Sequence, residues 1–323
     1  MNAKPLGLGV VALLLASGIL ISIASAAEYP ARPIRVVIPW PPGGSTDIVG
    51  RILAADLTAR FKQQVLIDNR AGAASIVGLQ FATAQPPDGY TLMMTSTAYG
   101  FLIDKPKVPV DLVNSFAPVA LIGFGESAII VHPSLPVKTV KDLIDLARKR
   151  PGEILYSSSG IGGFPHMNTE LFTLKTGAKM VHVPFKGGGP AIMDVVAGHS
   201  QLNFGSLVTV LPHVNSGRVR LVATGGAKRN PKHPNVPAIA ETVPGYEMST
   251  WYGAVVPVKT PREIVQRLNQ ELLKALALPD VKEKLAGLGA DVVGSSIEET
   301  VNIFKVDVAK FTKVAHAAKI TAD

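Results

Sequence analysis

The chain has 323 residues, of which 17% are charged, and its formal net charge is +8. It contains no cysteine, which excludes disulfides, thiolate nucleophiles and cysteine-based metal sites. The basic residues are scattered, with the densest group at 148–150, whereas nucleic-acid binding needs a concentrated basic face, so no nucleic-acid partner is expected.

Residues 1–26 have the features of a secretory signal peptide. Lys4 gives a basic start, residues 6–23 are mostly apolar, and Ala24-Ser25-Ala26 has the small-x-small form of a cleavage site. An uncleaved anchor is the alternative, but small residues within the stretch favour cleavage. We expect an exported protein with no stable membrane insertion after cleavage. The remaining 297 residues (323 minus 26) exceed one usual hydrophobic core, which favours two lobes.

A glycine-rich turn at residues 42–47 follows the first strand pattern and leads into an amphipathic helix pattern at 46–61. A helix start leaves backbone N–H groups without intrahelical partners at the positive end of the helix dipole, so this turn is suited to a carboxylate or a phosphate. In the simpler alternative, its serine or threonine is only an N-cap. The acidic residue of this turn, Asp47, would disfavour a bound anion unless its side chain turns away from the anion. The candidate ligand-binding residues are Gly43, Gly44, Ser45, Thr46 and Asp47.

Strand and helix patterns alternate along the rest of the chain, which is typical of an α/β protein with largely parallel sheets. The strand at 90–94 ends in the polar tip Thr95-Ser96-Thr97, and the long apolar segment at 119–131 is suited to cross between lobes. Further strands are expected at 34–40, 64–69, 154–157, 179–185, 201–207, 220–223 and 251–258, and further helices at 75–84, 140–150, 166–175, 261–276 and 297–316.

A second glycine-rich turn, at residues 159–163, also links a strand to a helix. It contains G-x-G but not the full dinucleotide fingerprint, and no suitable acidic residue follows about 20 positions later, so no nucleotide cofactor is expected. A histidine at the start of the following helix is suited to donate to an anion, although a lone histidine there is more often a surface or capping residue. The candidates are Ser159, Gly160, Ile161, Gly162, Gly163 and His166.

A third glycine turn, at residues 187–189, lacks the GK[ST] ending of a P-loop and is interpreted as a tight connection between a strand and a helix. The chain has no G-x-S-x-G elbow and no H-E-x-x-H or comparable histidine–carboxylate motif. We therefore expect no catalytic residues, no metal and no cofactor. Because triads assemble from distant positions, a secreted hydrolase that uses Ser45 or Ser159 with a distant histidine stays open as an alternative.

Seven short motifs are spread over nearly the whole chain after residue 26. Their ordered combination is more specific to one protein family than any single motif. They are YPARPIR at 29–35, PGGSTD at 42–47, DNRAGA at 68–73, AQPPDGYTL at 84–92, HVPFKG at 182–187, residues 237–245, and WYG at 251–253. Together they resemble the exported substrate-binding proteins of tripartite tricarboxylate transporters, also called Bug proteins.

This resemblance implies an α/β, two-lobed periplasmic-binding-protein (flytrap) fold, type II-like, with a cleft between the lobes. Lobe 1 would comprise residues 27–122 and 225–323, and lobe 2 residues 123–224. Family members hold small carboxylates in the cleft with backbone amides and ordered waters, without catalysis or a metal. The family's ligand loops fall on residues 42–47, on 95–97 with Ser96 and Thr97, and on 159–166.

Two departures from the family pattern concern the ligand. In the second of the resembling loops, Ala71 and Ala74 replace a common proline and glycine. Where members often carry aspartates after Gly198, this chain has Gln201 and Gly205. An inward-facing acid would suit an amino group, so Gly205 argues against an amino-acid ligand and leaves room for a larger one, such as an aromatic carboxylate.

The sequence thus predicts a periplasmic protein that binds a small carboxylate (a dicarboxylate, a tricarboxylate or an aromatic carboxylate) and delivers it to membrane transporter subunits. Besides the hydrolase, one further alternative stays open: a ligand sensor that reports to a membrane receptor.

Overall fold

The structure is a computed structural model that describes residues 29–97 and 114–317. From Arg32 onward the chain forms one compact unit, to which all the elements below belong. The signal peptide predicted at residues 1–26 lies outside the described residues.

The first part of the chain builds a parallel group of strands around β1. Val36, Val37 and Ile38 are at most 3% exposed, as expected for a strand with both faces covered. β1 pairs in parallel with β2 on one side and with β3 on the other. The elements are β1 (Ile34–Ile38), α2 (Ser45–Phe61), β2 (Val65–Asn69), η1 (Ala73–Ser75), α3 (Ile76–Thr83) and β3 (Thr91–Ser96).

A second parallel group forms around β5, which pairs with β6 and β7. Its first helix starts with a capping box, in which Thr139 and Asp142 satisfy each other's backbone N–H groups. The elements are α5 (Val140–Lys149), β5 (Leu155–Ser158), α6 (Phe164–Thr176), β6 (Val181–Pro184), α7 (Gly188–Val196), β7 (Leu202–Ser206), α8 (Leu207–Asn215) and β8 (Arg220–Thr224).

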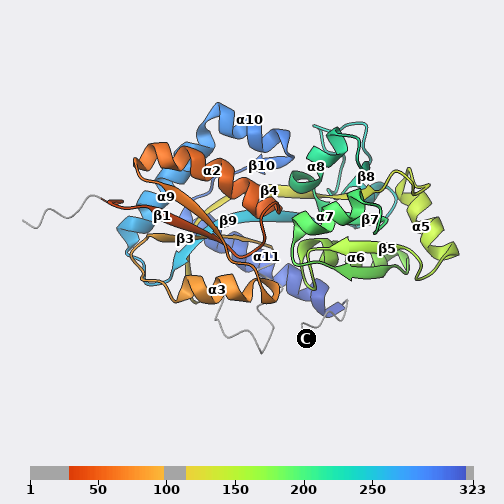
Figure 1. The fold of residues 1–323 in the computed structure, drawn as a ribbon, viewed down its shortest axis with the longest axis horizontal. Coiled ribbons are helices and arrows are strands. Elements are labelled where there is room, and N and C mark those ends of the chain that lie inside the picture. The colour runs from red at the N-terminus through yellow and green to blue at the C-terminus, as the bar shows by residue number, and fades with distance from the viewer. Residues whose placement is uncertain (1–28, 98–113, 318–323) are drawn as a thin grey trace, which may run out of the picture. The chain divides into compact units, whose positions relative to one another are not determined.

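Two strands, β4 (Phe116–Val131) and β9 (Ser249–Pro257), join the two groups (Figure 1). Residues 116–126 of β4 pair with β9, and residues 127–131 pair with β7 and β8. The strand order is β2-β1-β3-β9-β4-β7-β5-β6, with β8 and β10 also paired to β4. The expectation of largely parallel sheets is therefore wrong in the middle of the sheet, because β4 and β9 form antiparallel pairs with all their neighbours.

α9, β10 and α11 pack against β4, and α9 and α10 pack on α2. α9 buries one apolar stripe at helical spacing, in which Leu268, Leu272, Ala275 and Leu276 are at most 2% exposed. The helix α10 and the strand β10 were not expected from the sequence. The elements are η2 (Ile239–Glu241), α9 (Arg262–Ala277), α10 (Pro279–Gly287), β10 (Ala290–Val292) and α11 (Ile297–Ala317).

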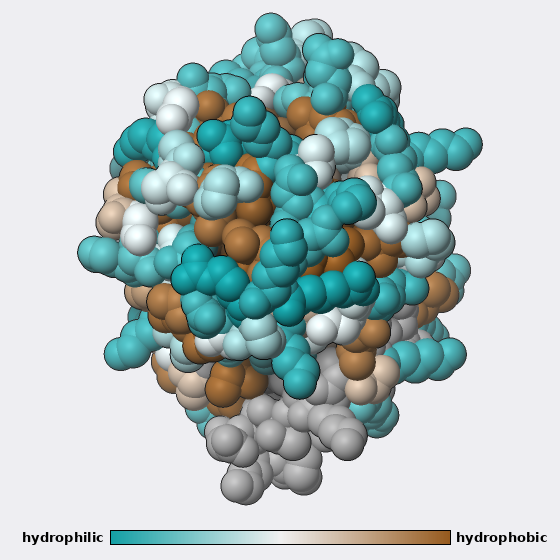
Figure 2. Space-filling model, turned by 90° about the vertical axis from the view of Figure 1, so that its right-hand side faces the viewer, coloured by the Kyte–Doolittle hydropathy of each residue, from teal (hydrophilic) through white to brown (hydrophobic). Residues whose placement is uncertain are grey.

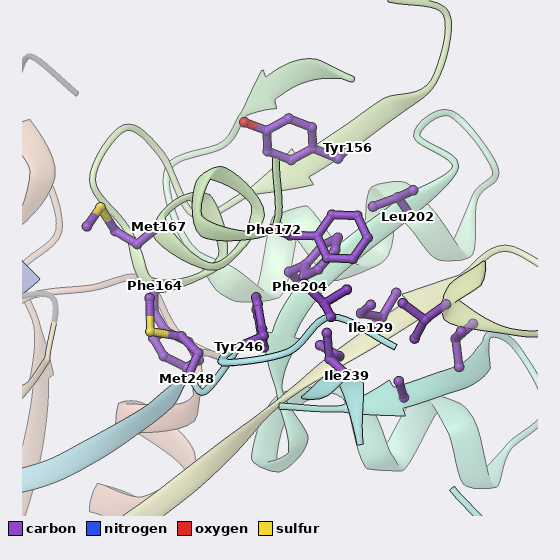
Figure 3. Close-up of a cluster of buried hydrophobic side chains, with 14 of the residues drawn as sticks. Ile129, Tyr156, Phe164, Met167, Phe172, Leu202, Phe204, Ile239, Tyr246 and Met248 are labelled. Carbon is purple, nitrogen blue, oxygen red and sulfur yellow. The ribbon is translucent and has the colours of Figure 1, made fainter. Parts of the chain in front are cut away.

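An aromatic cluster fixes α6 against β7 (Figure 3). The ring centroids of Phe172 and Phe204 lie 5.1 Å apart, and Tyr246 meets Phe172 edge-on at 6.4 Å. All three side chains are fully buried, and burying such a side chain contributes about 1.5–3 kcal/mol. Because α6 begins directly after the second glycine turn, this core also holds that turn in place.

Hydrophilic side chains cover most of the end of the unit that carries α5, with apolar residues reaching the surface between them (Figure 2). α5 buries Val140, Leu143 and Ala147 and exposes Arg148 and Lys149 in its last turn. Cations at a helix C-terminus interact favourably with the dipole. The densest basic group of the sequence therefore lies at the C-terminus of a helix.

Candidate functional site

A cavity lies where the first residues of four helices meet. Each helix start carries the positive end of a dipole and N–H groups that lack intrahelical acceptors, so together they favour a bound anion. β3, β7, β9 and Ser159 of the second glycine turn supply the other polar residues of the wall. The helix starts contribute Gly44 to Asp47 (α2), Phe164 and Pro165 (α6), Gly188 (α7), and Ser206 and Thr209 (α8), and the strands contribute Ser96, Asn203, Gly205 and Thr250.

The first glycine turn presents the start of α2 to the cavity. Gly44 is the N-cap and no side chain caps the helix. The first helical bond runs from Ile48 N to Gly44 O, at 3.0 Å, so the amides of Ser45 and Thr46 precede the helical ladder and have no acceptor within it. These two amides are the main-chain donors that the turn brings to the cavity wall.

The Asp47 carboxylate is engaged on the protein side of this turn. Its Oδ2 accepts hydrogen bonds from Gly43 N and Arg51 Nε, both at 2.9 Å, and its Oδ1 accepts one from Asn69 Nδ2 at 2.9 Å. Burial opposes ionisation, but the hydrogen bonds from Arg51, Gly43 and Asn69 outweigh it and lower the pKa of Asp47. The negative charge is thus compensated, and the Gly43 amide is occupied by Asp47.

The second glycine turn uses most of its own amides internally. Gly160 N donates to Ser158 Oγ at 3.0 Å, Gly162 N to His166 Nδ1 at 3.0 Å, and Gly163 N to Gly160 O at 3.1 Å. Three residues of this region line the cavity: Ser159 of the turn, and Phe164 and Pro165 at the start of α6.

His166 packs behind the second turn. Its ring stacks on the ring of His182, with the two centroids 4.2 Å apart. The ring of Tyr156 also stacks on His182, with centroids 4.9 Å apart. Burial, with the neighbouring His182 as a smaller cause, lowers the pKa of His166 to about 4, and burial lowers the pKa of His182 to about 4. Since Gly162 N donates to Nδ1, His166 is a neutral ring that supports the turn.

The third glycine turn connects β6 to α7, as expected, and it also packs directly on the first turn. A Cβ at Gly187 would lie 2.7 Å from the Pro41 ring, and one at Gly189 would lie 2.9 Å from Pro42 O. Side chains at these two positions would therefore force the turns apart. Glycine at both allows the starts of α2 and α7 to share one cavity wall.

The start of α8 is one of several parts of the site that the sequence did not predict; Gly188, Asn203 and Thr250 are others. Ser206 is the N-cap of α8, and its Oγ lies 2.9 Å from the hydroxyl of Tyr252. The Ser45 side chain also interacts with the Tyr252 hydroxyl, so this hydroxyl lies beside the starts of both α2 and α8. A serine directly after a strand pattern and before an apolar run is a helix-start signal that would have found this element.

Of the predicted ligand-binding residues, seven line the cavity: Gly44, Ser45, Thr46, Asp47, Ser96, Ser159 and Gly205. The other seven lie outside its wall: Gly43, Thr97, Gly160, Ile161, Gly162, Gly163 and His166. Thr97 is bonded to the wall residue Thr250, with the two hydroxyl oxygens 2.8 Å apart. For all fourteen, contact with a ligand stays a prediction.

Gly205 adds less space than expected. A Cβ on this residue would lie 2.8 Å from both Asn203 Oδ1 and Val210 Cγ1. The expectation that Gly205 leaves room for a larger ligand is therefore wrong in this respect, because neighbouring side chains already fill the place of its missing one.

The cavity wall combines polar residues with the apolar side chains of Trp40, Phe164, Pro165 and Ile192, and it carries little charge. Within residues 29–97 and 114–317, Asp47 is its one charged residue. No group of three or more His, Asp or Glu side chains suited to a metal ion occurs in that part of the chain. The described ranges also contain no helix with the length and apolarity needed to span a bilayer.

Residues 49–319 match the family described as the tripartite tricarboxylate transporter family receptor. The chain belongs to this receptor family. Among solved structures, it is similar to R. palustris Rpa4515 with adipate, with a TM-score of 0.88 and 34% identity over 91% of this chain and 99% of that one.

Two further solved structures have the same fold. The periplasmic binding protein BugD matches with a TM-score of 0.86 and 27% identity, covering 90% of this chain and 99% of BugD. MatC (Rpa3494) from Rhodopseudomonas palustris with bound malate matches with a TM-score of 0.84 and 26% identity, covering 88% of this chain and 99% of MatC. The predicted resemblance to Bug proteins and the two-lobed α/β periplasmic-binding-protein fold are thereby confirmed.

Proposed function

We propose that this receptor-family member is a periplasmic solute-binding protein that captures a small carboxylate for a tripartite tricarboxylate-type transporter. The observation that carries the proposal is the convergence of the starts of α2, α6, α7 and α8 on one cavity. The free-energy cost of removing a carboxylate from water must be offset by several hydrogen bonds to its charged oxygens, each worth about 1.5–3 kcal/mol. Main-chain donors suit this task because they are already fixed in place.

The ligands of related structures support a carboxylate. The Rpa4515 structure is described with adipate and the MatC structure with bound malate, and both acids are small dicarboxylates. In this chain, the amides of Ser45 and Thr46 would hold one carboxylate, and the starts of α6 and α8 lie in the same wall. Backbone donors are the proposed anion-binding groups because no lysine or arginine of the described residues lines the cavity.

Lobe closure is the proposed mechanism of capture. The proposed lobes are residues 27–122 with 225–323, and residues 123–224. The cavity residues of α2 come from the first lobe, and those of α6, α7 and α8 come from the second. A ligand that touches both lobes binds the closed state better than the open one, and this differential affinity is what shifts the population toward closure.

A thermal-shift screen of monocarboxylates, dicarboxylates and tricarboxylates, including aromatic ones, tests the proposal. A ligand at 100 times its dissociation constant should raise the free energy of unfolding by about 2.7 kcal/mol. Stabilisation by one class of carboxylate, with no turnover of it, is the expected result. The absence of any stabilising carboxylate, or hydrolysis of ester substrates that is lost in Ser45→Ala, would overturn the proposal.

Measuring carboxylate uptake by a deletion strain distinguishes a transport protein from a ligand sensor. A deletion strain should lose uptake of the stabilising carboxylate, and cell fractionation should find the protein in the periplasm. If uptake persists while a transcriptional response to the acid is lost, the protein is a sensor.

A further inference from the structure

Asn203 of β7 has a buried amide oxygen without a hydrogen-bond partner. The residue lines the cavity and is fully buried. Its Nδ2 donates to Ser157 O at 2.7 Å and to Ser157 Oγ at 3.1 Å, but its Oδ1 accepts nothing within the protein. A buried acceptor left unsatisfied costs more than the net value of an ordinary hydrogen bond, so such an atom calls for a donor.

The position of this oxygen is fixed by its own amide nitrogen. Exchanging the two amide atoms would place Oδ1 against the carbonyl oxygen of Ser157, so the orientation follows from the hydrogen-bond network. On the same face of β7, a Cβ at Gly205 would lie 2.8 Å from Oδ1, and Gly205 also lines the cavity. The unpartnered oxygen of Asn203 therefore lies beside Gly205, and both residues line the cavity.

We propose that Asn203 Oδ1 accepts a hydrogen bond from a hydroxyl group of the ligand, which makes the ligand a hydroxycarboxylate. This inference rests on the proposed function. An ionised carboxylate is acceptor-only and would repel Oδ1, and an apolar group would leave it unsatisfied. A ligand hydroxyl both satisfies the oxygen and distinguishes its acid from the acid that lacks the hydroxyl.

A hydroxyl fits this position better than an ammonium group. Asp47, the charged residue of the described wall, is already compensated by Arg51, Asn69 and Gly43. Four helix starts give the cavity a positive potential, which disfavours a cation. Asn203 is thus a specificity-determining residue for a neutral donor.

Calorimetric titration with matched pairs of acids tests this inference. The pairs are malate and succinate, citrate and tricarballylate, 2-hydroxyadipate and adipate, and mandelate and phenylacetate. For at least one pair, the wild-type protein should bind the hydroxy acid at least about tenfold more tightly. In Asn203→Leu, which keeps a similar volume without the acceptor, the ratio within that pair should fall to about one.

Two further variants make the test independent of any general damage. Asn168→Leu removes another fully buried asparagine, which bonds Phe204 O from α6 and lies outside the cavity wall, so it should keep the wild-type ratio. Gly205→Ala places a methyl group 2.8 Å from Asn203 Oδ1; it should lower the ratio even if Asn203→Leu does not fold.

The outcomes separate this inference from the proposed function. If carboxylates bind but no pair shows a hydroxyl preference, or if Asn203→Leu keeps the preference, the inference fails and the proposed function stands. If aspartate binds more tightly than malate and succinate, the donor is an ammonium group and the inference fails. If none of the eight acids and no other carboxylate binds, both fail.

Discussion

The hydroxyl oxygens of Ser206 and Tyr252 lie 2.9 Å apart and join the start of α8 to β9. Burial raises the pKa of Tyr252 to about 12, so its phenol is neutral and able to donate. Tyr252→Phe should remove a bond that orients the Ser206 hydroxyl at the cavity, lowering the free energy of unfolding by about 1 kcal/mol and carboxylate affinity by about fivefold. Calorimetric titration measures the loss of carboxylate affinity.

Tyr246→Phe is the matched control for this change. Tyr246 is equally buried, but its hydroxyl donates to Asn168 O at 3.3 Å, outside the cavity wall. The control should lose stability without losing affinity. Equal losses of affinity in both variants would show that Tyr252 has no specific effect on the site.

Gly189→Ala should weaken carboxylate binding while leaving the protein folded. Its methyl group would lie 2.9 Å from Pro42 O and 3.5 Å from Gly43, so it would push the third glycine turn away from the first. We expect a loss of at least about tenfold in affinity, equivalent to about 1.4 kcal/mol. The control is Gly287→Ala at the end of α10, outside the cavity wall, where no atom lies within 4 Å of an added Cβ; it should bind nearly as well as the wild type. Identical affinities for the two variants would contradict a role for this contact.

Acidification should destabilise the protein through the stacked histidines. The pKa values of His166 and His182 are lowered to about 4, whereas an unfolded histidine titrates near about 6.5. Between these values the unfolded chain takes up protons that the native protein refuses, so the free energy of unfolding falls as the pH falls from 6.5 toward 4. Each histidine contributes up to about 1.4 kcal/mol per pH unit.

Urea unfolding at pH 7 and pH 5 measures this effect. His182→Phe keeps an aromatic ring beside His166 and Tyr156 but cannot be protonated, so its stability should change less between the two pH values. A variant as pH-sensitive as the wild type would exclude the stacked pair as the cause.

Asp47→Asn should destabilise the protein by about 1–3 kcal/mol, because the N–H donors of Gly43, Arg51 and Asn69 lose their buried, charged acceptor. Chemical denaturation gives this value directly. The control is Asp145→Asn, which removes an exposed ion pair with Lys141 and should cost less than about 1 kcal/mol. Equal costs would mean that the bonds around Asp47 contribute no more than a surface pair.

Much of the fold was predictable because local signals agree with the final structure. Glycine turns and period-3.6 patterns placed α2, α5, α6, α9 and α11 within a few residues of their observed bounds. α8 was missed because Pro212 interrupts an apolar run that continues from β7, which hides the helical pattern. The antiparallel pairing of β4 with β9 and β7 joins distant segments, and no local pattern encodes such a pairing.

The site was predictable only as far as its helix starts. The sequence indicates that the turns before α2 and α6 carry free amides, but it does not show which amides the protein uses itself. Asp47 takes the Gly43 amide, and His166 takes the Gly162 amide. The unpartnered oxygen of Asn203 likewise depends on the contact between β5 and β7, so it emerges only from the tertiary structure.

The central claim is that main-chain N–H groups at the start of α2 hold a carboxylate, and calorimetric titration of Gly44→Val tests it most directly. Gly44 has φ −76° and ψ 163°, an extended conformation open to any residue, and the nearest atom to an added Cβ is 3.8 Å away. The variant should therefore fold with a near-native melting temperature. We predict that its affinity for the tightest-binding carboxylate falls by at least about a hundredfold, because the valine side chain covers the Ser45 and Thr46 amides. An affinity equal to that of the wild type would contradict the account.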